Sequence, residues 1–223
     1  YFKYTLIHKF LLLVEWGNNA MPNIKEKAIR IILFFILGIF SGFLAKYVDT
    51  IPSNGAIGSL INIISNISSR IGIWVFIATI IAAWSRTPRA GAIHVFTFFA
   101  GMLLAYYIYS MKLFNFFPVY YFVRWGLIAL ISPMAAYAVW FSRGSGWFAA
   151  LCAALPIGLL VSEGYNFLYT FSPVSGFYLI AAIILFCILP KNKYQYLKVL
   201  IFTILTSVLL SKFDVLSYII GGL

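Results

Sequence analysis

The sequence predicts an all-α fold, a polytopic integral membrane helix bundle with six to seven transmembrane helices plus one amphipathic outer helix. Hydrophobic residues make up 63% of the 223 residues and charged residues only 9%, whereas soluble domains carry about 25% charged residues. The mean hydropathy is +0.99. Apolar residues come in uncharged runs, and a helix needs roughly 20 of them to cross a hydrocarbon core. So few charged residues cannot form a water-facing surface, and we expect the chain to lie in a lipid bilayer.

The chain divides into two segments of different character, residues 1–20 and residues 21–223. The first contains an apolar stretch that is too short to span a bilayer, and it lacks the small-residue cleavage site of a signal peptide. We expect it to be an N-terminal leader or a short surface helix. Whether it is native stays open, because the chain from Met21 onward reads like a natural start. Residues 21–223 are expected to form a single transmembrane domain.

The stretch Arg70–Lys112 predicts a transmembrane hairpin. Two charge-free apolar runs, Ile71–Trp84 and Ala90–Tyr109, flank a short turn that contains Arg86 and Arg89. The second run has the length of a full span, whereas the first is shorter. The proline in the turn suits the first position of the second helix, where its missing N–H costs nothing. By the positive-inside rule, the two arginines assign this turn to the cytoplasm.

One span precedes the hairpin, and an amphipathic helix lies between the two. The span is expected at Ala28–Ala45, and its Gly38-x-x-x-Gly42 spacing is of a kind that lets two helices approach closely. From Ile57 to Ile67, apolar residues recur at helical spacing opposite serines and asparagines. We expect an uncharged amphipathic helix on the outer interface here. A re-entrant segment is the alternative.

Four further apolar runs predict the remaining spans, two of them with an internal proline at Pro133 or Pro156. The predicted spans are Val119–Phe141, Trp147–Ser162, Gly176–Leu189 and Tyr196–Phe213. Proline inside a transmembrane helix is tolerated where neighbouring groups satisfy the freed backbone carbonyl. The last span is the one whose complete crossing is least determined by the sequence.

The basic residues favour one orientation in the membrane. Eleven of them fall in segments on the side of the Arg86–Arg89 turn and five on the other side. The eleven are Lys3, Lys9, Lys25, Lys27, Arg30, Arg86, Arg89, Arg143, Lys191, Lys193 and Lys198. Because cytoplasmic loops carry the excess of Lys and Arg, we predict a multi-pass protein of the cell membrane with its N-terminus in the cytoplasm and its C-terminus outside.

The composition excludes several functional classes. The formal charge is +11, but the cations cluster at span ends, where they set orientation and meet anionic headgroups, so we expect no nucleic-acid partner. Cys152 and Cys187 lie inside apolar runs and are expected to be buried small hydrophobic residues without a metal. The five acids and two histidines form no paired-carboxylate or nucleophile–base pattern. We therefore expect no enzyme and no cofactor.

A few polar residues at span ends are the candidates for ligand binding near the outer face. Ionisable groups at membrane depth are costly and are functional candidates by default. The candidate residues are Glu163, Arg124, Arg70, Tyr106 and Tyr165. Two interpretations of Glu163 stay open. It is either an interfacial carboxylate paired with Arg124 or Arg70, or a ligand contact at the mouth of a tyrosine-lined cavity.

The middle of the chain resembles a known group of proteins. The residues that carry the resemblance are Arg70–Trp74, Trp84–Ala90 and Gly101–Tyr107. They are similar to a family of uncharacterised bacterial multi-spanning membrane proteins of unknown function. The resemblance implies a bacterial cytoplasmic membrane and supplies no activity. In size and loop layout the chain is also similar to the substrate-binding membrane subunits of energy-coupling-factor vitamin importers, which is an architectural analogy alone.

These observations favour a non-enzymatic membrane protein that binds or transports a small molecule or a lipid near its outer face. The expected partners are the lipid bilayer, a small-molecule ligand and another membrane protein. The alternative is a structural subunit that assembles with other membrane proteins through small-residue faces, namely Gly38, Gly42, Ala45 and Ala149–Ala154. An intramembrane enzyme is the least favoured function.

Overall fold

The computed structural model describes residues 24–51, 55–115, 117 and 119–212, and this part of the chain is helical and contains no strand. The predicted all-α fold is therefore confirmed. The predicted N-terminal leader and the end of the last span lie outside the described residues. The elements are α2 (Ile24–Thr50), α3 (Gly55–Ser69), α4 (Ile71–Ala83), α5 (Pro88–Phe114), α6 (Val119–Trp140), the 3₁₀ turn η1 (Phe141–Arg143), α7 (Gly146–Gly164), α8 (Phe167–Thr170), α9 (Pro173–Ile188) and α10 (Lys193–Lys212).

Among the described residues, five helices are long and apolar enough to cross a membrane, and a sixth span is obtained if α3 and α4 count as one broken span. The five lie within Ile24–Thr50, Pro88–Leu113, Val119–Arg143, Gly146–Thr170 and Lys193–Lys212. The span predicted at Gly176–Leu189 is α9, an apolar helix of 16 residues. This is shorter than the roughly 20 residues that a full crossing needs.

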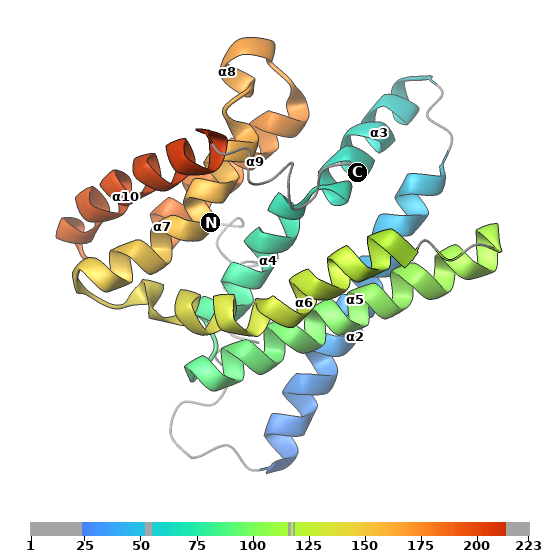
Figure 1. The fold of residues 1–223 in the computed structure, drawn as a ribbon, viewed down its shortest axis with the longest axis horizontal. Helices are drawn as coiled ribbons and strands as arrows, with labels where there is room; N and C mark the ends of the chain where they lie inside the picture. The colour runs from blue at the N-terminus through green and yellow to red at the C-terminus, as the bar shows by residue number, and fades with distance from the viewer. Residues whose placement is uncertain (1–23, 52–54, 116, 118, 213–223) are drawn as a thin grey trace, which may run out of the picture.

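The bundle has two groups of helices with α4 between them (Figure 1). Helix α5 packs against α2 and α6, and α7 packs against α9 and α10. Helix α4 contacts α5, α6, α7 and α9, so it joins the two groups. Residues of all these helices contribute to one hydrophobic core, including Phe98 on α5, Leu160 on α7 and Tyr178 on α9.

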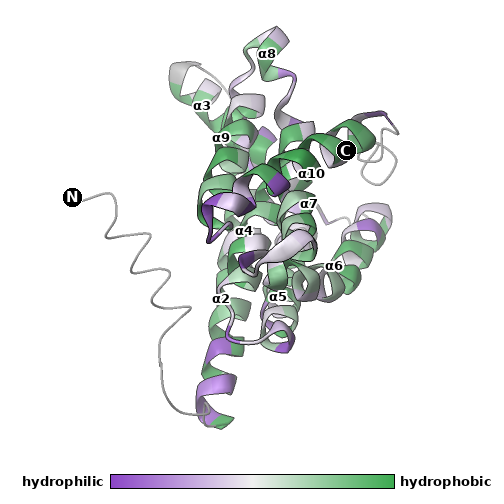
Figure 2. Cartoon of the chain, turned by 90° about the vertical axis from the view of Figure 1, so that its left-hand side faces the viewer, coloured by the Kyte–Doolittle hydropathy of each residue, from purple (hydrophilic) through white to green (hydrophobic). Residues whose placement is uncertain are grey.

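The outer faces of α2, α6 and α10 are apolar and exposed. On α2, Ile32, Ile36 and Phe40 are exposed, and α6 and α10 expose similar residues. Figure 2 shows hydrophilic residues in the first turns of α2 and hydrophobic residues along its middle. A contiguous apolar surface of this kind is unfavourable in water and suits a hydrocarbon environment. The structure therefore supports an integral membrane protein.

Helices α2 and α5 pack with their backbones almost in contact, and glycines make this possible. A Cβ atom at Gly38 would overlap the backbone carbonyl of Phe98, and one at Gly42 would overlap the carbonyl of Met102. On α5, a Cβ at Gly101 would overlap the carbonyl of Phe35. The Gly-x-x-x-Gly spacing thus does allow close packing, and its partner is a helix of the same chain.

Helices α3 and α4 are bent by 64° at a break beside Arg70. The helix predicted between Ile57 and Ile67 is present as α3, but it joins α4 directly. Its last carbonyl groups, which a helix C-terminus leaves without intrahelical partners, accept hydrogen bonds from elsewhere. Tyr178 Oη donates to Ile67 O at 2.8 Å, and Trp74 Nε1 donates to Ser68 O at 2.9 Å. The pair is a broken span or a re-entrant segment.

Three loops predicted on one side of the membrane gather at one end of the bundle. Trp140 Nε1 donates to Ser85 O at 2.7 Å, and the Arg143 guanidinium lies 4.4 Å from the Trp84 ring centroid. Gln195 Nε2 donates to Gly146 O at 2.8 Å. The predicted alternation of the chain across the bundle agrees with these contacts. The assignment of this end to the cytoplasm stays a prediction.

Candidate ligand sites at the two ends of the bundle

The structure brings two of the five predicted site residues together at the α3–α4 break. Arg70, the residue before α4, places its Nη1 atom 3.2 Å from Oε2 of Glu163 in the last turn of α7. The Glu163 side chain is 9% exposed and that of Arg70 is 49% exposed. Of the two partners that the sequence allows for Glu163, the structure shows Arg70. This ion pair ties α7 to the break.

The other three predicted residues lie elsewhere. The Arg124 guanidinium lies 4.1 Å from the ring centroid of Tyr120, one turn earlier on α6. Tyr165 follows α7 and is 42% exposed. Tyr106 lines a cavity at the end of the bundle opposite the arginine turn. The five residues therefore do not converge on a single site.

The cavity that Tyr106 lines is small and mostly aromatic. Its volume is about 80 Å³, and its walls come from α2, α5, α6 and the α3–α4 break. The lining residues are Ala45, Ser68, Ser69, Trp74, Met102, Leu103, Tyr106, Tyr107 and Trp125. Tyr107 is 3% exposed, and its hydroxyl oxygen has no hydrogen-bond partner among the described residues. We call this the outer cavity, after the side of the membrane on which the sequence predicts this end of the bundle.

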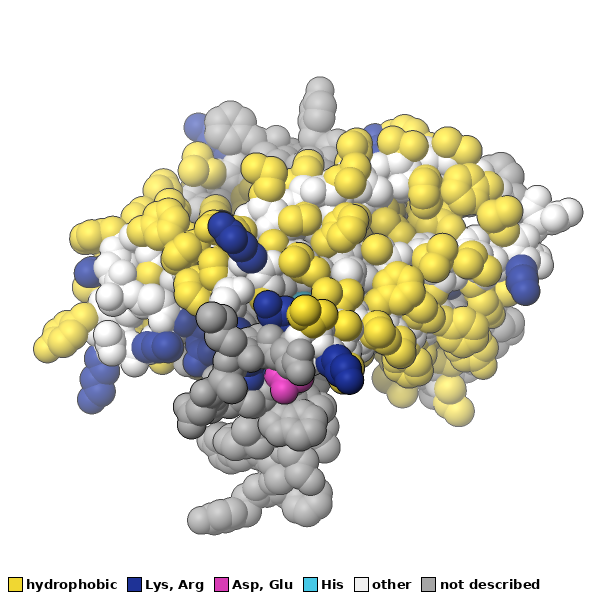
Figure 3. All heavy atoms as spheres, turned by 90° about the horizontal axis from the view of Figure 1, so that it is seen from below, with side chains coloured by type: hydrophobic (Ala, Val, Ile, Leu, Met, Phe, Trp, Pro, Cys, Tyr) yellow, Lys and Arg dark blue, Asp and Glu magenta, His cyan; other side chains and the backbone are white. Residues whose placement is uncertain are grey.

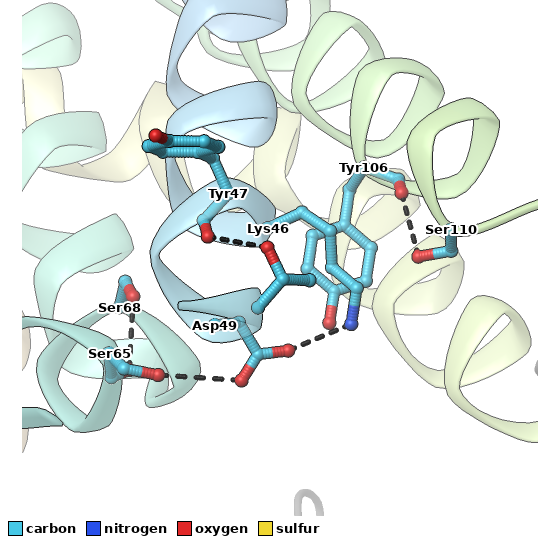
Figure 4. A network of polar contacts seen from close by, with 8 residues as sticks. Lys46, Tyr47, Asp49, Ser65, Ser68, Tyr106 and Ser110 are labelled. Atoms are coloured by element: carbon cyan, nitrogen blue, oxygen red, sulfur yellow. Dashed lines mark hydrogen bonds and ion pairs between the residues drawn. The ribbon is translucent and has the colours of Figure 1, made fainter. Parts of the chain in front are cut away.

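A polar network lies beside the outer cavity and connects α2, α3 and α5 (Figure 4). Lys46 Nζ lies 2.8 Å from Oδ2 of Asp49, and Ser65 Oγ donates to Oδ1 of the same carboxylate at 3.4 Å. The Lys46 ammonium also lies 5.0 Å from the ring centroid of Tyr106. These contacts hold the end of α2 against α3 and against the aromatic wall of the cavity.

A second, larger cavity lies at the opposite end of the α2–α5 pair. Its volume is about 370 Å³. It is lined by Lys27, Arg30, Ile31, Arg86, Thr87, Arg89, Ala90, Ile93 and His94. Four of these side chains are cationic, and no acidic residue belongs to the described lining. We call this the basic cavity. Figure 3, which views the molecule from below, shows Lys and Arg side chains gathered on this face.

Comparison with known proteins places the chain in a family. Residues 21–218 match a family of unknown function (DUF6518), which is most of the chain. The chain belongs to this family. No curated protein matches it, and no solved structure matches it either. The resemblance to an uncharacterised family is thereby confirmed.

From sequence alone, the residues of the basic cavity indicate topology and nothing more. Arg86 and Arg89 follow one apolar run, whereas Lys27 and Arg30 precede another, some sixty positions earlier. Only the close packing of α2 on α5 brings the two sets to one cavity. The available signal is Thr87 followed by a proline, because a helix N-terminus flanked by arginines is a favourable place for an anion.

The described cysteines and acidic residues show no arrangement for metal binding. Within the described part of this DUF6518 protein, no group of three or more His, Cys, Asp and Glu residues could hold a metal ion. Both cysteines are free. Cys152 is buried as expected, but Cys187 is exposed, so its predicted burial is wrong. It lies on the outward face of α9, an apolar helix whose outer side also exposes Ile183 and Ile184.

Proposed function

We propose that this protein is a non-enzymatic, multi-pass membrane protein that binds a small, mainly apolar molecule in the outer cavity and acts in its transport. The observation that carries the proposal is Tyr107, which lines the cavity and whose buried hydroxyl has no hydrogen-bond partner among the described residues. An unpaired buried polar group costs about 1–3 kcal/mol. A ligand that hydrogen-bonds to this hydroxyl would remove that cost, and this gives the cavity a preference for an occupant with one polar group.

The walls of the outer cavity favour an apolar or aromatic ligand body. Trp74, Tyr106 and Trp125 surround the same space as Tyr107, and aromatic rings provide large, rigid apolar surfaces for stacking. Small-molecule sites in proteins are commonly lined in this way, with only a few polar groups that orient the ligand. The cavity of about 80 Å³ accommodates a small group, such as a short alkyl chain or one end of a larger molecule.

The broken helix at the cavity supports a role in transport. Ser68, Ser69 and Trp74, which flank the break, all line the outer cavity. Transporters often place their substrate sites at discontinuous helices, because irregular backbone at membrane depth is tolerated where it borders a cavity. Under this proposal Tyr106 contacts the ligand, whereas Arg70 and Glu163 hold the break in position through their ion pair.

The alternative function is a structural subunit of a membrane complex. The small residues that suggested it are buried inside the bundle and do not support it. Gly38, Gly42 and Ala45 are buried and face α5 or the outer cavity. On α7, Ala149, Ala150, Cys152, Ala153 and Ala154 are buried within the chain. The small residues therefore already serve intramolecular packing.

The test is native mass spectrometry of the full-length protein released gently from membranes, comparing the wild type with Tyr107→Phe. We expect a reproducible small-molecule adduct on the wild type. Tyr107→Phe should reduce its occupancy roughly tenfold, because a hydrogen bond to a buried group that would otherwise be unpaired is worth about 1–3 kcal/mol. Tyr109→Phe is the matched control, since Tyr109 is on the same helix but stacks edge-on against Phe43 and is not among the lining residues.

The outcomes separate the proposed function from its rivals. An adduct on the wild type and on Tyr109→Phe that is lost on Tyr107→Phe would support binding in the outer cavity. An adduct retained by Tyr107→Phe, or a bare protein that copurifies with another membrane subunit, would contradict it. Arg124→Ala should leave the adduct occupancy unchanged, because the Arg124 side chain does not line the cavity.

A further inference from the structure

The basic cavity is a second site, at the other end of the α2–α5 pair, and the outer cavity plays no part in it. We infer that it binds a phosphate group, carried either by an anionic phospholipid or by a soluble phosphate compound. The four cations, the start of a long helix and a cavity of about 370 Å³ meet at this one place. Each of these features favours the same chemistry.

The cations come from two segments that converge on the cavity. Lys27 and Arg30 are on the first turns of α2, and Arg86 and Arg89 flank the residue that caps α5. The Arg30 and Arg86 charges act on each other repulsively, and Glu26 on α2 offsets part of this at Arg30. An anion between two like charges adds two attractive interactions that outweigh their repulsion. Arginine forks match the oxygens of phosphates and of carboxylates in a bidentate geometry, so the cavity suits an oxyanion.

The start of α5 adds a favourable dipole. Thr87 is the N-cap, where its Oγ1 accepts a hydrogen bond from the Ala90 N–H at 3.1 Å. The Gly91 N–H donates to Thr87 O at 2.9 Å, which closes the first turn. This helix has 27 residues, and the N-terminus of a long helix carries a partial positive charge with N–H groups directed outward. The same residues that cap the helix line the cavity.

The deep wall of the cavity is a histidine held in one orientation. His94 is 5% exposed, and its Nδ1 lies 3.1 Å from Ser85 Oγ. The Ser85 hydroxyl donates its single proton to Ile81 O at 2.7 Å, so Nδ1 of His94 is the donor in the contact with Ser85. The other ring nitrogen, Nε2, is then the hydrogen-bond acceptor of the neutral ring. A phosphate that retains one proton can donate to it.

The size of the basic cavity distinguishes its ligand from a bare inorganic ion. Small-molecule sites typically have volumes of roughly 300–1,000 Å³, and about 370 Å³ falls in this range. Ile31 and Ile93 provide an apolar wall beside the cations. The site therefore has room for a phosphate together with its organic substituent. Because the end with the Arg86–Arg89 turn is predicted to be cytoplasmic, this substituent is either the glycerol backbone of an inner-leaflet lipid or a cytoplasmic metabolite.

The experiment uses a pair of double variants that remove the same charge from the same end. Arg86→Gln with Arg89→Gln removes two cations of the cavity lining. Lys191→Gln with Lys193→Gln removes two exposed cations that do not line it. Full-length protein is reconstituted in phosphatidylcholine nanodiscs with or without phosphatidylglycerol, and bound lipid is counted by native mass spectrometry. In pure phosphatidylcholine discs, inorganic phosphate and glycerol 3-phosphate are titrated by calorimetry.

One outcome is that the arginine variant retains phosphatidylglycerol at least tenfold more weakly than the wild type, whereas the lysine variant retains it equally well. This outcome would identify a lipid headgroup as the source of the phosphate. Binding of glycerol 3-phosphate with the same dependence would identify a soluble ligand. Equal losses in both double variants, or binding of neither probe by the wild type, would overturn the inference. The single variant Arg89→Gln, at an exposed position, gives a reduced but measurable effect if the double variant fails to fold. The Tyr107→Phe result is independent of all these outcomes.

Discussion

Two helix contacts in this protein are stabilised in opposite ways. Helices α2 and α5 meet through glycines, and their backbones approach so closely that even a methyl group has no space. Helices α3 and α4 meet at a 64° bend, where Tyr178, Trp74 and the Arg70–Glu163 pair supply polar contacts. At the glycines, the first contact depends on shape. The second depends on satisfying the backbone groups that the break exposes.

The difference shows what each contact contributes to the two candidate sites. The α2–α5 pair borders both cavities, because Ala45 and Tyr106 lie at one end and Arg30 and His94 at the other. It is therefore expected to be the rigid part of both sites. The α3–α4 break borders the outer cavity alone. A few hydrogen bonds hold it in place, so we expect it to be the part of the bundle that changes most readily.

The largest expected effect is the loss of the α2–α5 packing. In Gly42→Leu, the new side chain overlaps the backbone of Met102, which cannot move without shifting the whole of α5. We expect a loss of about 3 kcal/mol or more in the free energy of unfolding, at the upper end of overpacking effects. The measurement is reversible unfolding in mixed detergent micelles, followed by circular dichroism and tryptophan fluorescence.

The control for this substitution is Gly126→Leu in α6. A Cβ at Gly126 has no neighbouring atom within 4 Å, and leucine has a higher helix propensity than glycine, so we expect this substitution to be neutral or to stabilise by up to about 1 kcal/mol. If both leucine variants unfold at the same denaturant concentration, close glycine packing does not stabilise this bundle. In that case the rigid role assigned to the α2–α5 pair is also wrong.

A smaller effect is expected from the hydrogen bonds at the break. Tyr178→Phe keeps the fully buried ring but removes the hydroxyl that donates to Ile67 O. The carbonyl retains only a long 3.4 Å contact from the Arg70 N–H. We expect a destabilisation of about 1–2 kcal/mol, the usual cost of a buried acceptor that loses its donor. The same unfolding assay measures it, and Tyr169→Phe on an exposed ring should leave the unfolding midpoint unchanged.

The sequence predicts local features of the fold well and long-range contacts poorly. Helix starts and apolar runs follow from neighbouring residues, and so the start of α5 at Pro88 is predicted correctly. The bent junction of α3 with α4 is anticipated only by the alternative of a re-entrant segment. The Tyr178 hydroxyl that satisfies α3 is 111 positions from Ile67, and no periodicity connects two residues so far apart. A loop between the two helices is the simplest interpretation without that partner.

The same limit applies to the candidate sites. Glu163 and Arg70 stand out in the sequence as costly polar groups near span ends, and they form an ion pair although 93 positions separate them. The sequence does not show which distant residues come together in space. Tyr107 resembles its neighbouring tyrosines until its burial and unpaired hydroxyl are known. The arginines of the basic cavity resemble ordinary topology signals until α2 packs on α5 and brings Arg30 towards Arg86.

The smallest expected effect belongs to the Arg70–Glu163 ion pair, and it decides whether the break is fixed by charge or by hydrogen bonds. Arg70 is about half exposed, and exposed ion pairs contribute roughly 0–1 kcal/mol. We expect Glu163→Gln to lower the free energy of unfolding by about 0.5 kcal/mol, with less loss at high salt because screening already weakens the pair. A double-mutant cycle with Arg70→Gln isolates the coupling energy between Arg70 and Glu163. A coupling energy above that of the Tyr178 hydrogen bond would reverse the order of the two effects, and the break would then be held mainly by charge.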